Sequence, residues 1–181
     1  MEPTLEQLQY PVGKWKWPTH ESVTQDQIRL AINTIAIFPA DMMEAVKDLT
    51  EDQLNTPYRQ DGWTIRQVVH HTADSHMNAY MRFKLALTED NPTIRPYDQA
   101  KWAELIDSKE SSEISLFILT GIHKRWVALM KNMTVSDWAR PLKHPEHDRQ
   151  LTLAMISQQY KWHCEHHLQH IIRLKERKGW Q

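Results

Sequence analysis

Four long segments of the chain carry hydrophobic residues at spacings of three and four, which is the period of an amphipathic α-helix. These segments cover residues 24–49, 64–87, 113–132 and 152–179. Each apolar stripe is flanked by polar positions, so each must be buried against another element. The pattern therefore predicts an all-α protein, and a four-helix bundle is the simplest architecture that buries four such stripes.

Residues that start, bend or stop helices lie at the expected places in these segments. Pro39 lies inside the first segment and is expected to kink or restart that helix. Gly179 follows the last segment and is expected to end the fourth helix. The predicted N-caps are Thr24, Thr64, Ser112 and Thr152. In the third segment, the pattern points Ile114, Phe117, Ile118, Ile122, Trp126 and Met130 toward the core.

The stretches between the helices differ in length and composition. Residues 1–22 contain three prolines and an aromatic cluster at 15–18, and we expect an extended arm over the domain surface. Residues 88–111 form a connection too long for a tight hairpin, so they are expected to cross the bundle or to act as a lid, with a short helix near 100–106. Residues 143–150 are expected to form a polar loop. The whole chain, 1–181, is expected to be a single domain.

Composition and charge narrow the class of protein further. Charged residues make up 25% of the chain, hydrophobic ones 40%, and the formal net charge is -1, so no polyanion partner such as nucleic acid is expected. No hydrophobic run reaches the roughly 20 residues that span a bilayer, and the first residues do not resemble a signal peptide. The single cysteine, Cys164, fits a reducing compartment and is expected in the core. We therefore expect a cytoplasmic protein without a membrane partner.

The fourth segment concentrates four histidines between residues 163 and 170. On a helical wheel of about 100° per residue, His167 falls on the apolar stripe and His163 at its edge, whereas His170 lies just beyond and His166 outside. His163 and His167 are four residues apart, which lets two imidazoles of one helix reach the same metal ion. Two imidazoles on an apolar face cost free energy unless they are paired or coordinated, so a metal site is favoured over a histidine-rich surface helix.

A line of polar side chains runs beside the apolar stripe of the second segment. His71, Ser75, Asn78 and Arg82 follow one another at spacings of four, three and four. A polar line that borders a buried face is typical of a pocket wall, and a solvated helix face is the alternative interpretation. The neighbouring His70 projects away from the apolar stripe. Ser75, Asn78 and Arg82 are therefore the candidate pocket residues of this helix.

His71, His163 and His167 together make a candidate three-histidine metal site between two helices of the bundle. Three protein ligands leave one position of a tetrahedral metal ion open for water or substrate, which indicates catalysis more than a structural role. Imidazole ligands suit zinc, nickel, cobalt or iron. We expect one divalent transition metal, with zinc or nickel as the main candidates.

Two parts of the chain resemble the DinB superfamily of metal-binding four-helix bundles. The first is Gly62-Trp63-Thr64-Ile65-Arg66-Gln67-Val68-Val69-His70-His71-Thr72-Ala73-Asp74-Ser75-His76, and the second is the pattern His163-x-x-x-His167-Leu168-x-His170. The likeness is greatest to the YfiT-like branch, whose members are named metal-dependent hydrolases and which includes bacillithiol S-transferase. The resemblance covers the whole chain and implies that His71, His163 and His167 hold the metal and that the protein is a homodimer. Thr72 is a mild departure, because leucine is usual there.

Three functions are compatible with this site. The first is the transfer of a low-molecular-weight thiol of the bacillithiol type to an electrophile, in which the metal lowers the pKa of the thiol. The second is hydrolysis by a metal-bound water, which usually needs a carboxylate base. The third is a non-catalytic metal-binding stress protein.

The carboxylates of the chain favour thiol transfer among these three. The second and fourth helices offer no carboxylate on their inward faces, and Asp74 is better placed to orient His71 than to act as a base. The connection 88–111 would be the source of a base if there is one, with Asp98 and Glu104 as candidates. Arg82, and with it Arg95, is a candidate to bind a carboxylate of an acidic thiol.

Overall fold

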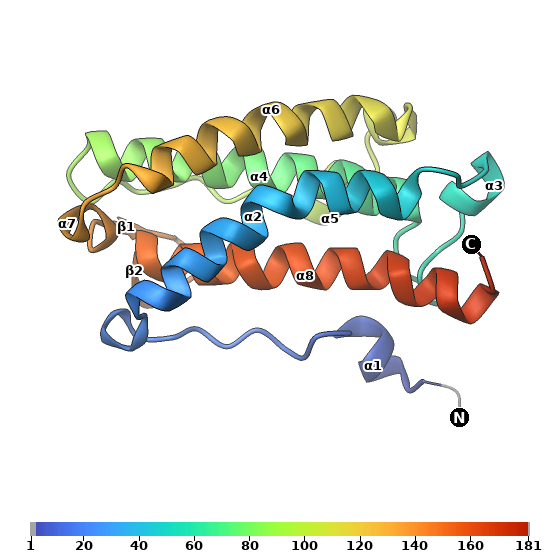
Figure 1. Cartoon of the computed structure of the whole chain (residues 1–181), viewed down its shortest axis with the longest axis horizontal. Helices are drawn as coiled ribbons and strands as arrows, with labels where there is room; N and C mark the ends of the chain where they lie inside the picture. Colours follow the sequence, from blue (N-terminus) through green and yellow to red (C-terminus); the bar gives the residue numbers. More distant parts are fainter. Residues whose placement is uncertain (1–2, 181) are drawn as a thin grey trace.

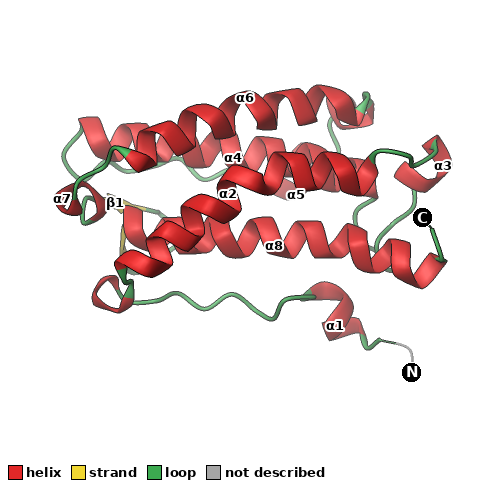
Figure 2. Ribbon diagram, in the orientation of Figure 1, coloured by secondary structure: helices red, strands yellow, loops and turns green. Residues whose placement is uncertain are grey.

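Four long helices dominate the computed structural model, which describes residues 3–180 (Figures 1 and 2). They are α2 (Gln25–Val46), α4 (Ile65–Thr88), α6 (Ser112–Lys131) and α8 (Leu153–Lys178). The predicted all-α four-helix bundle is therefore confirmed. None of the described helices is both long and apolar enough to cross a membrane.

The four helices do not follow one another around the bundle. Helix α2 packs against α6 and α8, and α4 packs against the same two helices. The order around the bundle is therefore α2, α6, α4 and α8, so the consecutive long helices α2 and α4 lie diagonally opposite each other. As a result α4 and α8, which carry the candidate metal ligands, are direct neighbours.

The residues that cap and end the helices are the predicted ones, except that one N-cap lies one residue earlier than predicted. Thr24 and Thr64 accept backbone hydrogen bonds in complete capping boxes, Thr152 caps α8, and Gly179 ends α8 in the left-handed conformation with φ of 65°. The cap of α6 is Ser111 and not Ser112, because the Ser111 hydroxyl accepts from the amide of Glu113.

Helix α2 runs through Pro39 without a restart. Proline at this position removes one backbone donor, and the carbonyl that loses it is bonded from another helix, as described below. The alternative prediction, that the helix restarts at this residue, is therefore wrong.

The connections contain more regular structure than the sequence indicates. The arm includes the short helix α1 (Leu5–Gln9) and the 3-10 turn η1 (His20–Ser22), and α3 (Glu51–Leu54) precedes α4. The long connection after α4 holds α5 (Gln99–Trp102) and the turn η2 (Ile106–Lys109), and α7 (Val135–Trp138) follows α6. The predicted polar loop is the turn of a small antiparallel hairpin, β1 (Pro141–Lys143) with β2 (Gln150–Thr152).

The core fills the centre of the bundle with side chains from all four long helices. The largest fully buried ones include Phe38, Met42, Phe83, Leu119, Trp126, Met130 and Ile156, and Cys164 is buried as predicted. Ile114 and Phe117 were expected to point inward, but they are 51% and 71% exposed. The buried stripe of α6 instead runs through Leu116, Leu119 and His123, because α6 turns this face to both α2 and α4.

Candidate metal centre

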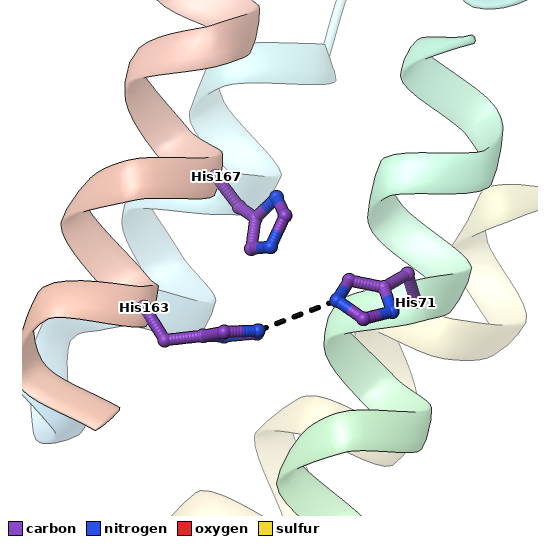
Figure 3. Close-up of side chains that lie close together, drawn as sticks. All are labelled: His71, His163 and His167. Atoms are coloured by element: carbon purple, nitrogen blue, oxygen red, sulfur yellow. Dashed lines mark hydrogen bonds between the residues drawn. The ribbon is translucent and has the colours of Figure 1, made fainter. Parts of the chain in front are cut away.

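His71 of α4 faces His163 and His167 of α8 across the contact between the two helices (Figure 3). The Nε2 atoms of His71 and His163 are 3.3 Å apart, and one ring nitrogen of each of the three histidines lies within 4.8 Å of the others. His71 and His167 are buried, and His163 is half-buried. The structure thus brings together the three residues that the wheel pattern selected.

The spacing of these nitrogens fits a bound metal ion. Zinc binds imidazole nitrogens at about 2.0–2.1 Å, so two ligands of a tetrahedral ion are about 3.4 Å apart. The 3.3 Å between the Nε2 atoms of His71 and His163 meets this requirement. A donor set of three neutral imidazoles suits a divalent transition metal. His71, His163 and His167 are therefore the residues that would hold it.

Burial keeps the three imidazoles in the form that a metal requires. Burial lowers the pKa of His71 to about 3, and it lowers the pKa of His163 and His167 well below the usual value of an imidazole. The positive charge that each neighbouring histidine would carry acts in the same direction. A neutral imidazole has a free lone pair, so these rings can bind a metal ion without first losing a proton at neutral pH.

A second group of histidines lies beside the first on α8. It consists of His166, His167 and His170, again with one nitrogen of each within 4.8 Å of the others, and it shares His167 with the first group. His166 was expected outside the buried face, but it is only 8% exposed. The wheel could not show this, because the residues that cover His166 and His170 come mainly from distant parts of the chain.

The N-terminal arm runs beside α8 and provides part of that cover (Figure 1). His170 donates from Nε2 to the carbonyl of Gln9 at 3.2 Å, and the Trp162 indole donates to the carbonyl of Gly13 at 3.0 Å. His166 stacks on Trp162 at 4.3 Å between ring centroids. The arm therefore forms one wall of the region around the metal centre.

Two cavities meet at the histidine site. One of about 500 Å³ is lined by all three candidate ligands together with Tyr58, Arg59 and Trp63. The other, of about 640 Å³, is lined by Ser75, Arg82, Tyr97, His144, His147 and Tyr160. His163, Gln99 and Gln159 line both cavities. The metal position would thus be accessible from two sides.

Of the predicted pocket residues, two line a cavity. Ser75 and Arg82 both line the larger one, and the Tyr160 hydroxyl donates to the Ser75 carbonyl at 3.1 Å, which joins α4 to α8 at this level. Asn78 lines neither cavity, and its amide donates to the backbone carbonyl of Asp74. The predicted wall is therefore made by His71, Ser75 and Arg82, without Asn78.

His70 lies elsewhere than the sequence suggested, whereas Asp74 lies away from both cavities, in agreement with the prediction that it does not act as a base. His70 was expected to point away from the buried face, but it is 7% exposed. Its Nε2 donates to the Glu110 carbonyl at 3.0 Å, and its Nδ1 is 2.7 Å from the Ser115 hydroxyl. Burial, followed by the charge of Asp107, raises the pKa of Asp74 to about 6. Since neither residue lines a cavity, neither is placed to react with a bound molecule.

Two buried histidines near the centre were not singled out from the sequence. His76 of α4 and His123 of α6 are 0% and 1% exposed, and His76 lies 3.0 Å from Nδ1 of His163. His76 follows His71 by five residues, and His123 occurs within an otherwise hydrophobic stripe. That position in a hydrophobic stripe is the signal that could have indicated them, because a buried imidazole needs a polar partner.

The fold and the site together define a four-helix bundle with a candidate histidine metal centre between two neighbouring helices. The model of the DinB superfamily matches residues 35–171, and the chain belongs to this superfamily.

Relatives and a solved structure match over almost the whole chain. A protein of Bacillus cereus (strain B4264) named "Putative metal-dependent hydrolase" is 46% identical over 176 residues, which cover 97% of this chain and 100% of the relative. A protein of the same name from Bacillus thuringiensis subsp. konkukian has the same identity and coverage. The structure of YfiT from Bacillus subtilis, described as a probable metal-dependent hydrolase with an unusual four-helix bundle topology, has a TM-score of 0.92. It is 46% identical and covers 97% of this chain and 99% of its own.

Removing the metal is expected to lower the melting temperature without unfolding the protein. A metal that binds only the folded state stabilises it by RT ln(1 + [L]/Kd), while the core of Phe38, Phe83 and Trp126 does not depend on the site. Circular dichroism melting curves with and without a chelator check this prediction. If the helical signal disappeared at 25 °C on chelation, the metal would be structural.

Proposed function

We propose that this protein is a metal-dependent enzyme that transfers a low-molecular-weight thiol to an electrophile. The observation that supports this most directly is the pair of cavities that share His163, Gln99 and Gln159. A transferase must hold two substrates at one reacting centre, and cavities of about 500 and 640 Å³ on two sides of the histidines give each substrate its own space.

The candidate ligands of the chain supply the metal chemistry. When bound, a divalent metal lowers the pKa of a thiol or a water in its open position. His71, His163 and His167 would hold the metal beside both cavities, since all three side chains line the smaller one and His163 also lines the larger. Both zinc and nickel suit this ligand set.

The larger cavity contains one arginine that suits an acidic group of a substrate, alongside the carboxylates of Asp98 and Glu146. Arg82 lines it together with His144 and His147. Burial, followed by the charge of Arg82, lowers the pKa of His144, so Arg82 is the permanent cation of this wall. A guanidinium can bind a carboxylate with two parallel hydrogen bonds. We therefore assign this cavity to a carboxylate-bearing substrate, such as a thiol of the bacillithiol type, and the smaller aromatic cavity to the electrophile.

Hydrolysis by a metal-activated water is the second candidate, and the name of the relatives favours it. It usually needs a carboxylate base. Asp98 lines the larger cavity, but hydrogen bonds from the backbone and side chain of Lys101 lower its pKa, which makes it a weak base. Glu104 lines neither cavity and accepts a hydrogen bond from Gln67. Asp61 lines the smaller cavity with the three candidate ligands, and Glu146 lines the larger one, so carboxylates are present in both cavities. Thiol transfer is therefore favoured by the two separate cavities and not by the lack of a carboxylate.

The expected oligomer is a homodimer, which we propose from the family resemblance. Helix α6 presents Ile114 and Phe117 to solvent at 51% and 71% exposure, and the preceding segment exposes Leu105 and Ile106. Exposed apolar side chains of this size are common at interfaces between subunits. A second copy of this chain is the partner that we propose for them.

The pH dependence of turnover distinguishes thiol transfer from hydrolysis. For thiol transfer, we expect conjugation of a generic electrophile to require both zinc or nickel and a thiol. It should persist well below the thiol's free pKa of roughly 8.5, because the metal favours the thiolate. For hydrolysis, an ester or amide should be cleaved without thiol, with a rate that rises through an apparent pKa of about 7. Initial rates measured between pH 5 and 9 with and without thiol distinguish the two reactions.

Two variants serve as controls for this experiment. Arg82→Gln should raise KM for a carboxylate-bearing thiol more than for a neutral thiol, because only the former loses an ion pair. Thiol-independent hydrolysis that disappears in Asp98→Asn or Glu104→Gln would establish the hydrolase instead. Turnover of neither kind with bound metal present would leave the non-catalytic metal-binding protein as the correct description.

A further inference from the structure

A row of hydrogen bonds connects the metal centre to all four long helices. Nδ1 of His163, on α8, is 3.0 Å from Nε2 of His76, on α4. Nδ1 of His76 is in turn 2.7 Å from Nε2 of His123, on α6. Nδ1 of His123 finally bonds to the backbone carbonyl of Ile35, on α2. The row therefore begins at a candidate metal ligand and ends at a backbone group in the core.

The last bond sets the direction of all the others. A carbonyl oxygen can only accept, so Nδ1 of His123 carries the proton, and Nε2 of this neutral ring accepts. His76 must then donate from Nδ1 and accept at Nε2. His163 must in turn donate from Nδ1, which leaves the lone pair on its Nε2. That Nε2 is the atom that faces His71 in the candidate site.

The reversed direction would leave polar groups unpaired in the core. If His163 accepted at Nδ1, His76 and His123 would each donate from Nε2. The Nδ1 of His123 would then point a lone pair at the carbonyl of Ile35. Both rings are almost fully buried, so two facing acceptors would have no water to separate them. Burial also disfavours a charged imidazole that could donate in both directions.

Pro39 explains why the Ile35 carbonyl is free to accept. In an α-helix this carbonyl would accept from the amide of residue 39, four positions on, but proline has no N–H. A buried carbonyl without a donor costs free energy, and the imidazole of His123 supplies that donor. The proline that the helix tolerates thus creates the anchor of the row.

We propose that His76 and His123 are positioning residues that hold His163 in the tautomer with its proton on Nδ1, so that Nε2 is ready to bind the metal. The ring nitrogens of His76 and His123 are bonded to other residues of the row, so both residues act on the metal position through His163. A metal-ligating histidine commonly donates its other N–H to a carboxylate, carbonyl or water. Here the N–H of His163 donates to His76, and the hydrogen bonds continue through His123 to the Ile35 carbonyl on another helix.

Nuclear magnetic resonance of the metal-free protein tests the tautomer directly. Long-range proton–nitrogen spectra of protein labelled with 15N-histidine distinguish a protonated Nδ1 from a protonated Nε2. We expect His163, His76 and His123 all to be protonated on Nδ1. A proton on Nε2 of His163 would overturn the proposal. This measurement needs no substitution, so it decides even if a variant fails to fold.

Zinc affinity of a matched pair of variants tests the positioning role. His123→Phe keeps a ring beside Phe38, which stacks on His123 at 5.7 Å, but removes the anchor. The proton of His163 is then free to move to Nε2, and we expect zinc affinity to fall about 10- to 100-fold. His70→Phe is the control, because His70 is also buried and hydrogen-bonded but lies outside the row. It should bind zinc as the unmodified chain does.

The expected zinc affinities rest on the proposed metal-dependent function, and the outcomes below show whether the positioning role or that function has failed. Equal zinc affinity in folded His123→Phe and in the unmodified chain would overturn the positioning role. An equal loss in His70→Phe would also overturn it, because general destabilisation would then explain both results. The predicted tautomer of His163 in a chain that binds no zinc would overturn the proposed function, while the assignment of the tautomer would stand.

Discussion

Replacing His71 with alanine is expected to abolish stoichiometric metal binding, and so are His163→Ala and His167→Ala. Each removes one of only three protein ligands, and two imidazoles on a flexible coordination sphere do not retain a divalent ion at micromolar concentration. Each variant should still fold, because the three side chains line the smaller cavity and the hydrophobic core of Phe38, Phe83 and Trp126 is unchanged. Elemental analysis of the purified variants after dialysis measures the metal content per chain.

Alanine variants of the neighbouring histidines are the controls. His70→Ala and His166→Ala should keep nearly full metal content, because neither ring belongs to the candidate set. His170→Ala distinguishes the two histidine groups, since His170 belongs only to the group on α8. Full metal content in His71→Ala together with its loss in His170→Ala would show that the ion binds at the second group.

The sequence predicted the bundle and the three converging histidines because both depend on local periodicity. An apolar stripe and a spacing of four residues fix which side chains of one helix share a face. The same two patterns place His163 and His167 on the face of α8 that carries its apolar stripe. His71 could be added because it belongs to a polar line beside a buried stripe. No knowledge of the neighbours was needed for any of these steps.

The errors arose where a residue's surroundings come from distant parts of the chain. His166 is covered by Tyr10 of the N-terminal arm in addition to Trp162 of its own helix, and His70 by residues 110 and 115 of another segment. A wheel ranks faces by hydrophobicity and cannot show that a polar face is covered too. Phe117 shows the opposite error, because a hydrophobic residue is exposed where the bundle offers no neighbour within the described residues.

The row from His163 to Ile35 could not be predicted from periodicity either. It needs the diagonal placement of α2 and α4, which lets α6 and α8 each contact both of them. Pro39 suggested only a bend in a helix. Its structural consequence, a free carbonyl facing His123, depends on which helix packs against that turn.

The metal-free protein is expected to unfold cooperatively as the pH falls from about 6 to about 4. Burial lowers the pKa of His71 and His170 to about 3 and of His123 and His166 to about 4. In the unfolded chain an imidazole has a pKa of about 6.5. Below that pH the unfolded state binds more protons than the folded state, so the free energy of unfolding falls as the pH falls.

The size of this effect is comparable with the whole stability of a domain. Each of these four histidines contributes a loss of about 1.4 kcal/mol for each pH unit below 6.5, or roughly 5.6 kcal/mol per pH unit together, against a total of about 5–15 kcal/mol. His76, His163 and His167, whose pKa burial also lowers, add to this loss. Asp74 acts in the opposite direction. Its pKa is raised to about 6, so the folded state gains a proton there before the unfolded chain does. One such group offsets only one of the four histidines.

Urea unfolding of the metal-free protein at pH 7, 6 and 5 measures this dependence, because its slope with pH gives the number of protons taken up on unfolding. We expect about six by pH 5, seven histidines less one aspartate, because burial also lowers the pKa of His76, His163 and His167 well below 6.5. His170→Phe should lower that number by about one while keeping the stack on Tyr58, whose ring lies 3.9 Å away. A free energy of unfolding that does not change between pH 7 and 5 would mean that these imidazoles are protonated in the folded protein, and their lone pairs would then not be available to a metal.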